Sequence, residues 1–155
     1  MIPEIKTFLI AMSPIVELRG SIPIALNVYH LPIWSAYLFS VLGNLVPLVL
    51  IISVLEPVSR FLGRRISFLD KFFKWLFSHT RKANLSKFKR WGEGLAVVIL
   101  VATPIPFVGG WTGAICAFVF GIPFKKALPL VVIGSLLAGV IVTLLTLGIT
   151  QTVNF

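Results

Sequence analysis

Three long stretches of this sequence carry no charged residue, and they constrain the fold more than any other feature. Residues 20–55, 94–124 and 127–155 contain no Asp, Glu, Lys or Arg. A transmembrane helix needs about 20 consecutive apolar residues. Apolar residues make up 57% of the chain and charged residues 12%, which is about half the charged share of a soluble domain. The sequence therefore predicts an all-α integral membrane protein.

Four apolar segments occur in two pairs, which are 3–29 with 33–55 and 94–121 with 127–150. A basic linker, 57–92, lies between the pairs. The pairs align at an offset of 90 residues, with Pro14 over Pro104 and Gly20 over Gly110. After one inserted residue the offset becomes 91, with Asn44 over Ser135. An ordered series of matches with one gap indicates an internal duplication, with repeats at 1–56 and 93–155.

The first segment of each pair is interrupted. Ser13-Pro14 is typical of a helix start, because the hydroxyl can cap the helix and proline fits its first position. We expect legs at 5–13 and from Pro14 to about Val28, and in the second segment at Leu95–Ala102 and Trp111–Gly121. At ~1.5 Å per residue, such legs fall short of the ~30 Å hydrocarbon core. Each segment is therefore either one kinked span or a re-entrant hairpin.

The distribution of positive charge favours re-entrant hairpins. Ten of the 14 Lys and Arg residues lie in the linker, and Lys125 and Lys126 lie before the last span. Only re-entrant hairpins place all twelve on one face, which the positive-inside rule makes cytoplasmic. The repeats are then inverted in the plasma membrane, with both termini outside. Because non-helical backbone at membrane depth must be surrounded by protein or water, the two hairpin tips should meet near the midplane.

The linker is predicted to form a basic amphipathic helix in the cytoplasmic interface. Phe and Leu recur at roughly helical spacing between Ser67 and Lys82, with Lys and Arg among them, and Ser67 with Asp70 resembles a capping box. Its cations would contact anionic lipid head groups. The excess of basic residues is thus explained by the membrane, and no nucleic-acid partner is expected.

Glu17 and Arg19 are the charged residues of the membrane part that lie away from its ends. An ionisable group at depth is by default a functional hypothesis. Residues two apart on a regular helix do not face each other. We therefore expect no good pair between them unless Gly20 and Pro23 unwind the helix, and Arg19 would remain for an anionic ligand. Desolvation would make Glu17 a candidate proton carrier.

The other candidate residues surround the expected meeting point of the tips. Each returning leg presents a helix N-terminus there, which favours phosphate or carboxylate. This layout is that of many secondary transporters. The candidate substrate-binding residues are Ser13, Pro14, Glu17, Arg19, Gly20, Pro23, Asn44, Thr103, Pro104, Pro106, Gly109, Gly110, Trp111, Thr112 and Ser135.

The sequence carries no motif for catalysis, a metal or a cofactor. Cys116 is the one cysteine and lies in an apolar run, and His30 and His79 have no ligand partners at suitable spacing. A Gly-x-Ser-x-Gly elbow and a nucleotide-binding glycine loop are both absent. We therefore expect neither an enzyme nor a metal or cofactor site.

Two stretches resemble the signatures of a known family. Pro-Ile-Val-Glu-Leu-Arg-Gly-Ser-Ile-Pro-Ile-Ala (14–25) and Ala-Thr-Pro-Ile-Pro-Phe-Val-Gly-Gly-Trp-Thr-Gly-Ala (102–114) resemble the small multidrug export protein family, a relative of the DedA/SNARE-associated (VTT) superfamily. The resemblance implies inverted repeats of a re-entrant hairpin and a spanning helix. It also implies an acid and a base near the tips, which Glu17 and Arg19 match. Larger relatives are implicated in moving lipids, including polyprenyl-phosphate carriers, and in proton coupling.

These observations predict a flippase or secondary transporter for an anionic amphiphile such as a polyprenyl-phosphate lipid, with proton coupling as an option. The alternatives are an exporter of cationic compounds, which Arg19 would repel, and a non-transporting scaffold. We expect a homodimer, because four short elements enclose little protein. The small residues of the last span would form the close-approach face or pack within the chain, and they are Gly134, Ser135, Ala138 and Gly139.

Overall fold

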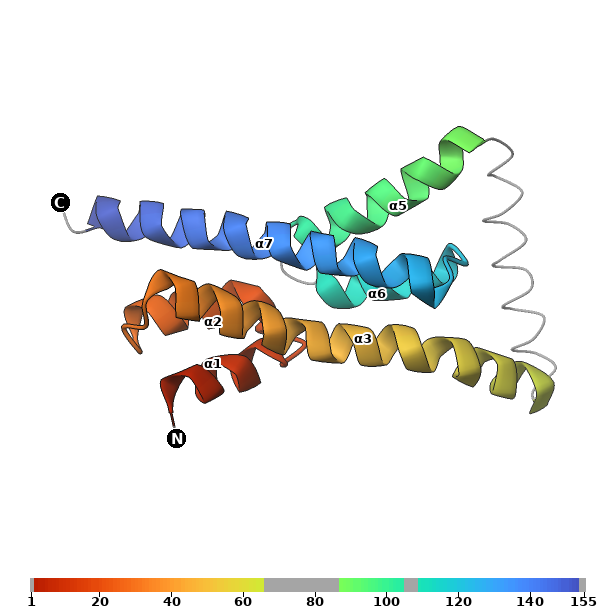
Figure 1. Cartoon of the computed structure of the whole chain (residues 1–155), viewed down its shortest axis with the longest axis horizontal. Helices are drawn as coiled ribbons and strands as arrows, with labels where there is room; N and C mark the ends of the chain where they lie inside the picture. Colours follow the sequence, from red (N-terminus) through yellow and green to blue (C-terminus); the bar gives the residue numbers. More distant parts are fainter. Residues whose placement is uncertain (1, 66–86, 105–108, 154–155) are drawn as a thin grey trace.

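The computed structural model describes residues 2–65, 87–104 and 109–153, and all regular structure within these ranges is helical (Figure 1). The helices are α1 (Pro3–Ala11), α2 (Glu17–Asn27), α3 (Ile33–Arg65), α5 (Lys87–Ala102), α6 (Gly110–Val119) and α7 (Phe124–Val153). Two stretches, Ile33–Leu55 and Phe124–Thr152, are long and apolar enough to cross a membrane. The predicted all-α class and the two long apolar helices are thus confirmed. The expected interfacial helix between Ser67 and Lys82 lies outside the described residues.

Several helix ends differ from those predicted. The helix α3 continues to Arg65 and α5 begins at Lys87, so both enter the segment predicted as linker. An apolar pattern marks where a helix can contact hydrocarbon, whereas backbone hydrogen bonding can continue into charged residues. The helix α2 begins at Glu17 and not at Pro14, because residues 13–16 form a turn in which the Glu17 N–H donates to the Ser13 carbonyl over 3.0 Å.

The short helices form two hairpins that point toward the middle of the molecule from opposite ends (Figure 1). The first hairpin, α1 with α2, packs on α3, and the second, α5 with α6, packs on α7. The returning helices also cross to the other long helix, since α2 contacts α7 and α6 contacts α3. Both termini lie at one end of the molecule. The end of α3, the start of α5 and the α6–α7 turn lie at the other.

Two glycines at aligned positions of the long helices allow the first helix of each hairpin to approach closely. A Cβ on Gly43 would lie 2.9 Å from the Ala11 Cβ and closer still to the Phe8 carbonyl oxygen. A Cβ on Gly134 would lie 2.6 Å from the Val101 Cβ and 3.2 Å from the carbonyl oxygen of residue 98. Residues 98 and 101 follow 8 and 11 by the same offset of 90 that aligns the sequences. The same helix-to-glycine contact therefore occurs twice.

The core consists of two apolar clusters with polar residues between them. One cluster joins α2, α3 and α7, and its buried members are Leu18, Ile22, Val41, Ala138 and Val142. The other joins α3, α5, α6 and α7, and its buried members are Leu48, Ile52, Val97, Val101, Ala114, Ala117, Ala127 and Val131. Asn44, which is 1% exposed, follows Val41 and precedes Leu48 on α3. Ser135 lies between Val131 and Ala138 on α7 and is fully buried. A polar layer thus crosses the middle of the core.

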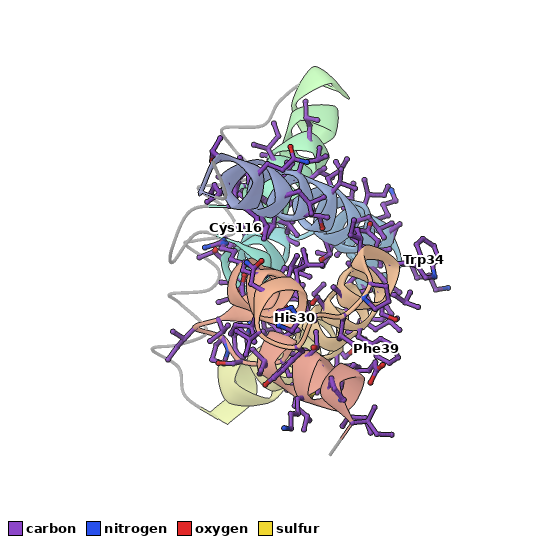
Figure 2. The ribbon with its side chains drawn as sticks, turned by 90° about the vertical axis from the view of Figure 1, so that its left-hand side faces the viewer. His30, Trp34, Phe39 and Cys116 are labelled. Atoms are coloured by element: carbon purple, nitrogen blue, oxygen red, sulfur yellow. The ribbon has the colours of Figure 1, made fainter. Side chains whose placement is uncertain are left out.

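The outer surfaces of the long helices are strongly apolar. Large exposed side chains include Leu42 and Leu50 on α3 and Leu137, Leu144 and Ile149 on α7. Trp34, near the start of α3, is 73% exposed and extends outward from the ribbon (Figure 2). Continuous apolar surface on this scale is unusual for a soluble monomer and fits a lipid environment.

The small residues of α7 that were considered for a dimer face pack within the chain. Gly134 lies against Val101, Gly139 lies against Tyr37, and Ser135 and Ala138 are buried. These small residues therefore allow close packing within one chain, which was the alternative to a dimer face.

Candidate functional site

Glu17 and Arg19 form an ion pair at the first turn of α2. The Arg19 Nη2 lies 3.8 Å from the Glu17 Oε2, and the side chains are 22% and 11% exposed, respectively. The two residues, which were expected to form no good pair, come within ion-pair distance for a local reason. Glu17 has φ of 47°, in the left-handed region that non-glycine residues rarely adopt. The helical spacing argument therefore does not apply at Glu17, whereas Gly20 and Pro23, whose unwinding was the stated condition for pairing, lie within the helix.

The pair also joins the two hairpins. The Arg19 Nη2 donates a hydrogen bond to the Thr103 carbonyl oxygen over 3.1 Å, just after α5 ends. The Trp111 backbone N–H, in the first turn of α6, donates to the Glu17 Oε1 over 3.5 Å. The expectation that the tips meet therefore agrees with the contacts. The expectation that Arg19 is left without a protein partner is wrong, because it contacts both a carboxylate and a carbonyl oxygen.

Gly109 and Gly110 provide space for these contacts. A Cβ on Gly109 would lie 2.7 Å from the Glu17 Oε2 and closer still to the Arg19 Nη2. A Cβ on Gly110 would lie 2.8 Å from the Leu48 Cδ1. Gly109 has an extended backbone with φ of −177°, so close approach, and not a special conformation, is what requires glycine there.

Thr112 fixes the conformation of the second tip. Its Oγ1 accepts a hydrogen bond from the Gly109 N–H over 2.7 Å and donates to the Gly109 carbonyl over 3.2 Å. A tip held in this way presents the first turn of α6 to Glu17.

Several buried polar atoms in the middle of the molecule have no hydrogen-bond partner within the described residues. They include the Asn44 Oδ1, the Ser135 Oγ and the Trp111 Nε1. The Ser40 Oγ, one helical turn before Asn44, is also buried and unpartnered. Sequence analysis missed Ser40, although its spacing of four from Asn44 was a usable signal. Leaving such groups unpaired is costly, so this layer is suited to a polar ligand.

The remaining candidates have local roles. The Ser13 Oγ accepts a hydrogen bond from the Ile15 N–H over 3.4 Å in the turn before α2, where Pro14 is exposed. A Cβ on Gly20 would collide with the Val16 side chain. Pro23 is half-buried inside α2, as is Pro104 just after α5. Pro106 lies outside the described residues.

One ion pair and the ends of four helices set the electrostatics of the centre. Two helix N-termini, of α2 at Glu17 and of α6 at Gly110, meet beside Arg19. Each N-terminus is equivalent to about half a positive charge. The C-termini of α1 at Ala11 and of α5 at Ala102 lie at the same tips with about half a negative charge each, and Glu17 opposes Arg19, so the formal charges nearly balance. Within the described residues, no three His, Cys, Asp or Glu side chains are placed to hold a metal ion.

Comparison of the sequence with known proteins identifies a family. A family model described as "Putative small multi-drug export protein" matches residues 17–141, from Glu17 through both hairpin tips and most of α7. Neither the curated proteins nor the solved structures give a match. The matched range covers most of the chain, and the two long apolar helices suit a membrane transporter. The chain therefore belongs to the small multi-drug export protein family.

Proposed function

We propose that this protein transports an anionic amphiphile, such as a polyprenyl-phosphate or other phospho-lipid, across the plasma membrane. The observation that carries the proposal is the position of Arg19. It lies at the contact between the two hairpins, where the N-termini of α2 and α6 converge and one carboxylate opposes it. The partial charges of the α2 and α6 N-termini are offset by those of the α1 and α5 C-termini at the same tips, so the preference for an anion rests on the Arg19 guanidinium and the backbone N–H donors of the two first turns. A phosphate head group is attracted there, and a cation is repelled.

We further propose that the two hairpins are re-entrant and that the repeats are inverted, as in the DedA-related topology that the motifs imply. The helix α1 has 9 residues and α2 has 11, so each is well short of the ~30 Å hydrocarbon core. The glycine contact that occurs at both Gly43 and Gly134 supports a duplicated unit.

The distribution of chain ends supports the proposed orientation. Both termini lie at one end of the molecule, and the start of α7, which carries Lys125 and Lys126, lies at the other with the ends of α3 and α5 that border the basic linker (Figure 1). Under the positive-inside rule the latter end is cytoplasmic. A central site between inverted repeats can then be exposed to either side by relative movement of the repeats.

The test is lipid movement in proteoliposomes. Purified protein should accelerate transfer of a fluorescent polyprenyl phosphate across the bilayer. It should have little effect on a labelled phosphatidylcholine, whose head group is zwitterionic.

Arg19→Ala should reduce the rate to that of protein-free liposomes. Arg19→Lys should restore it in part, because a point charge replaces a planar fork suited to phosphate. Lys125→Ala, at an exposed position on α7, is the matched control for loss of a positive charge and should leave the rate unchanged.

A purely structural role for the ion pair predicts a different pattern. Either single neutral substitution would then lower the melting temperature and the yield, and the double substitution Glu17→Gln with Arg19→Gln would partly restore both. Wild-type transport by a well-folded Arg19→Ala variant would refute the proposal. Because the family description names multi-drug export, the transport assay should also include a cationic dye as a substrate. Movement of the dye without movement of the phosphate lipid would assign the protein to cationic drug export.

A further inference from the structure

We propose that the Glu17 carboxylate occupies the head-group site of this transporter and acts as a tethered competitor that the anionic substrate must displace. The inference rests on the proposed function and concerns the same centre. Glu17 contacts both positive groups there, with one oxygen toward each. Its Oε2 lies 3.8 Å from the Arg19 Nη2 and its Oε1 lies 3.5 Å from the Trp111 backbone nitrogen.

The lengths of these contacts show that the carboxylate is held loosely. Charge-assisted N–H···O bonds are usually about 2.7–2.9 Å long, and both Glu17 contacts are longer. The Arg19 guanidinium is instead held in place by its 3.1 Å bond to the Thr103 carbonyl. The cationic part of the site is thus held from the other hairpin by a bond that is shorter than its contact with the Glu17 carboxylate.

The backbone gives a reason why Glu17 can be displaced. Its φ of 47° is an unfavourable conformation for a residue with a β-carbon. Such strain persists where the surrounding contacts maintain it. The contacts that aim Glu17 at Arg19 and α6 are the same ones that a substrate would take over. When the carboxylate leaves, the backbone at Glu17 can therefore relax to a more favourable φ.

Additional donors in the polar layer favour an occupant larger than a carboxylate. The Ser135 hydroxyl is fully buried, the indole Nε1 of Trp111 is a buried atom, and neither has a hydrogen-bond partner in the described part of the chain. Both can donate to a phosphate oxygen. The Glu17 carboxylate has two oxygens, which contact Arg19 and the Trp111 backbone, whereas a tetrahedral phosphate has more oxygens to offer to further donors.

Competition of this kind has a consequence for the transport cycle. Without substrate, the Glu17 carboxylate neutralises Arg19, so the centre avoids an uncompensated buried charge. With substrate, the phosphate replaces the carboxylate. Glu17 then returns when the substrate leaves, which assists release. Removing its charge should strengthen substrate binding.

The test measures binding and not flux, so that it is separate from the test of the proposed function. Trp111 becomes the reporter when the other tryptophans, Trp34, Trp75 and Trp91, are replaced by phenylalanine. The probe is dioctanoyl phosphatidic acid added to protein in detergent, with dioctanoylglycerol as the uncharged control. Inorganic phosphate in a parallel titration shows whether the head group alone is sufficient.

In this background Glu17→Gln should bind the phosphatidic acid up to about fivefold more tightly than the parent, and at least twofold, in line with the strength of a single ion pair. Glu17→Asp keeps the charge and should bind within about twofold of the parent. Equal or weaker binding by a folded Glu17→Gln variant would overturn the inference. Glu17→Ala is the second neutral variant. If neither neutral variant folds, Glu17 is a structural anchor and the inference is likewise wrong.

Arg19→Ala separates the two proposals. If it binds the probe as the parent does, the anionic-substrate function fails, whatever Glu17 does. If Arg19→Ala abolishes binding but Glu17→Gln brings no gain, the anionic site stands and only the competitor role is discarded.

Discussion

Replacing Gly109 by alanine should impair transport without unfolding the protein. The added methyl would lie 2.7 Å from the Glu17 Oε2 and closer still to the Arg19 Nη2. Both atoms are at the ends of flexible side chains, so the backbone can stay in place while the ion pair moves. The extended φ of Gly109 is also acceptable for alanine. The perturbation therefore falls on the site and not on the fold.

The magnitude follows from the distances. To reach an ordinary contact of 3.4 Å, the Glu17 Oε2 must retreat by about 0.7 Å. Lengthening the 3.8 Å pair by that amount weakens the attraction by roughly 0.7 kcal/mol at an effective dielectric constant of about 20. Loss of the Arg19–Thr103 hydrogen bond adds about 1 kcal/mol. Because a weaker pair with the competing Glu17 by itself favours the substrate, the lower rate comes from the loss of the Arg19–Thr103 bond, and about 1 kcal/mol corresponds to a roughly fivefold lower rate of lipid transfer.

Alanine substitutions at two other glycines serve as controls. Gly148→Ala, where nothing lies within 4 Å of the added methyl, should preserve both transport and melting temperature. Gly110→Ala places the methyl 2.8 Å from the Leu48 Cδ1 and should lower the melting temperature through overpacking. Transfer rates are measured in proteoliposomes, and melting temperatures are measured on the same preparations. Wild-type transfer by Gly109→Ala, or a lower rate that merely follows a lower melting temperature, would contradict the proposed role of Arg19.

Three further predictions concern packing and topology. Gly43→Ala should destabilise the protein by about 1–3 kcal/mol, seen as a lower melting temperature, because the methyl meets backbone atoms of α1. Tyr37→Phe should cost about 1 kcal/mol in the same assay and leave transport unchanged, because it removes only the 3.1 Å bond to a carbonyl of α7. In a Cys116→Ala background, a cysteine at His30 should react with an impermeant reagent outside intact cells and one at Lys126 should not. Reaction at both would refute the re-entrant topology.

The sequence alone determined which parts of the chain are helical and apolar. The uncharged stretches gave the two long helices, Ile33–Leu55 and Phe124–Thr152, because a bilayer requires apolar length and a helix satisfies its own backbone hydrogen bonds locally. Proline and glycine marked the interruptions near Pro14 and Thr103. The alignment of the two halves, at offsets of 90 and 91 residues, is matched in the structure by the repeated glycine contact on the two long helices.

The tertiary structure decided how the charged residues are used. Glu17 and Arg19 pair because of one left-handed residue, and the spacing of two along a helix argued for the opposite result. Arg19 then contacts a carbonyl 84 residues away, and Glu17 contacts the first turn of α6. Helical periodicity describes neighbours on one helix and holds no information about which backbone atoms another hairpin brings into reach. Whether a buried charge has a partner depends on that packing, so only the folded chain could show that Glu17 lies between Arg19 and the first turn of α6.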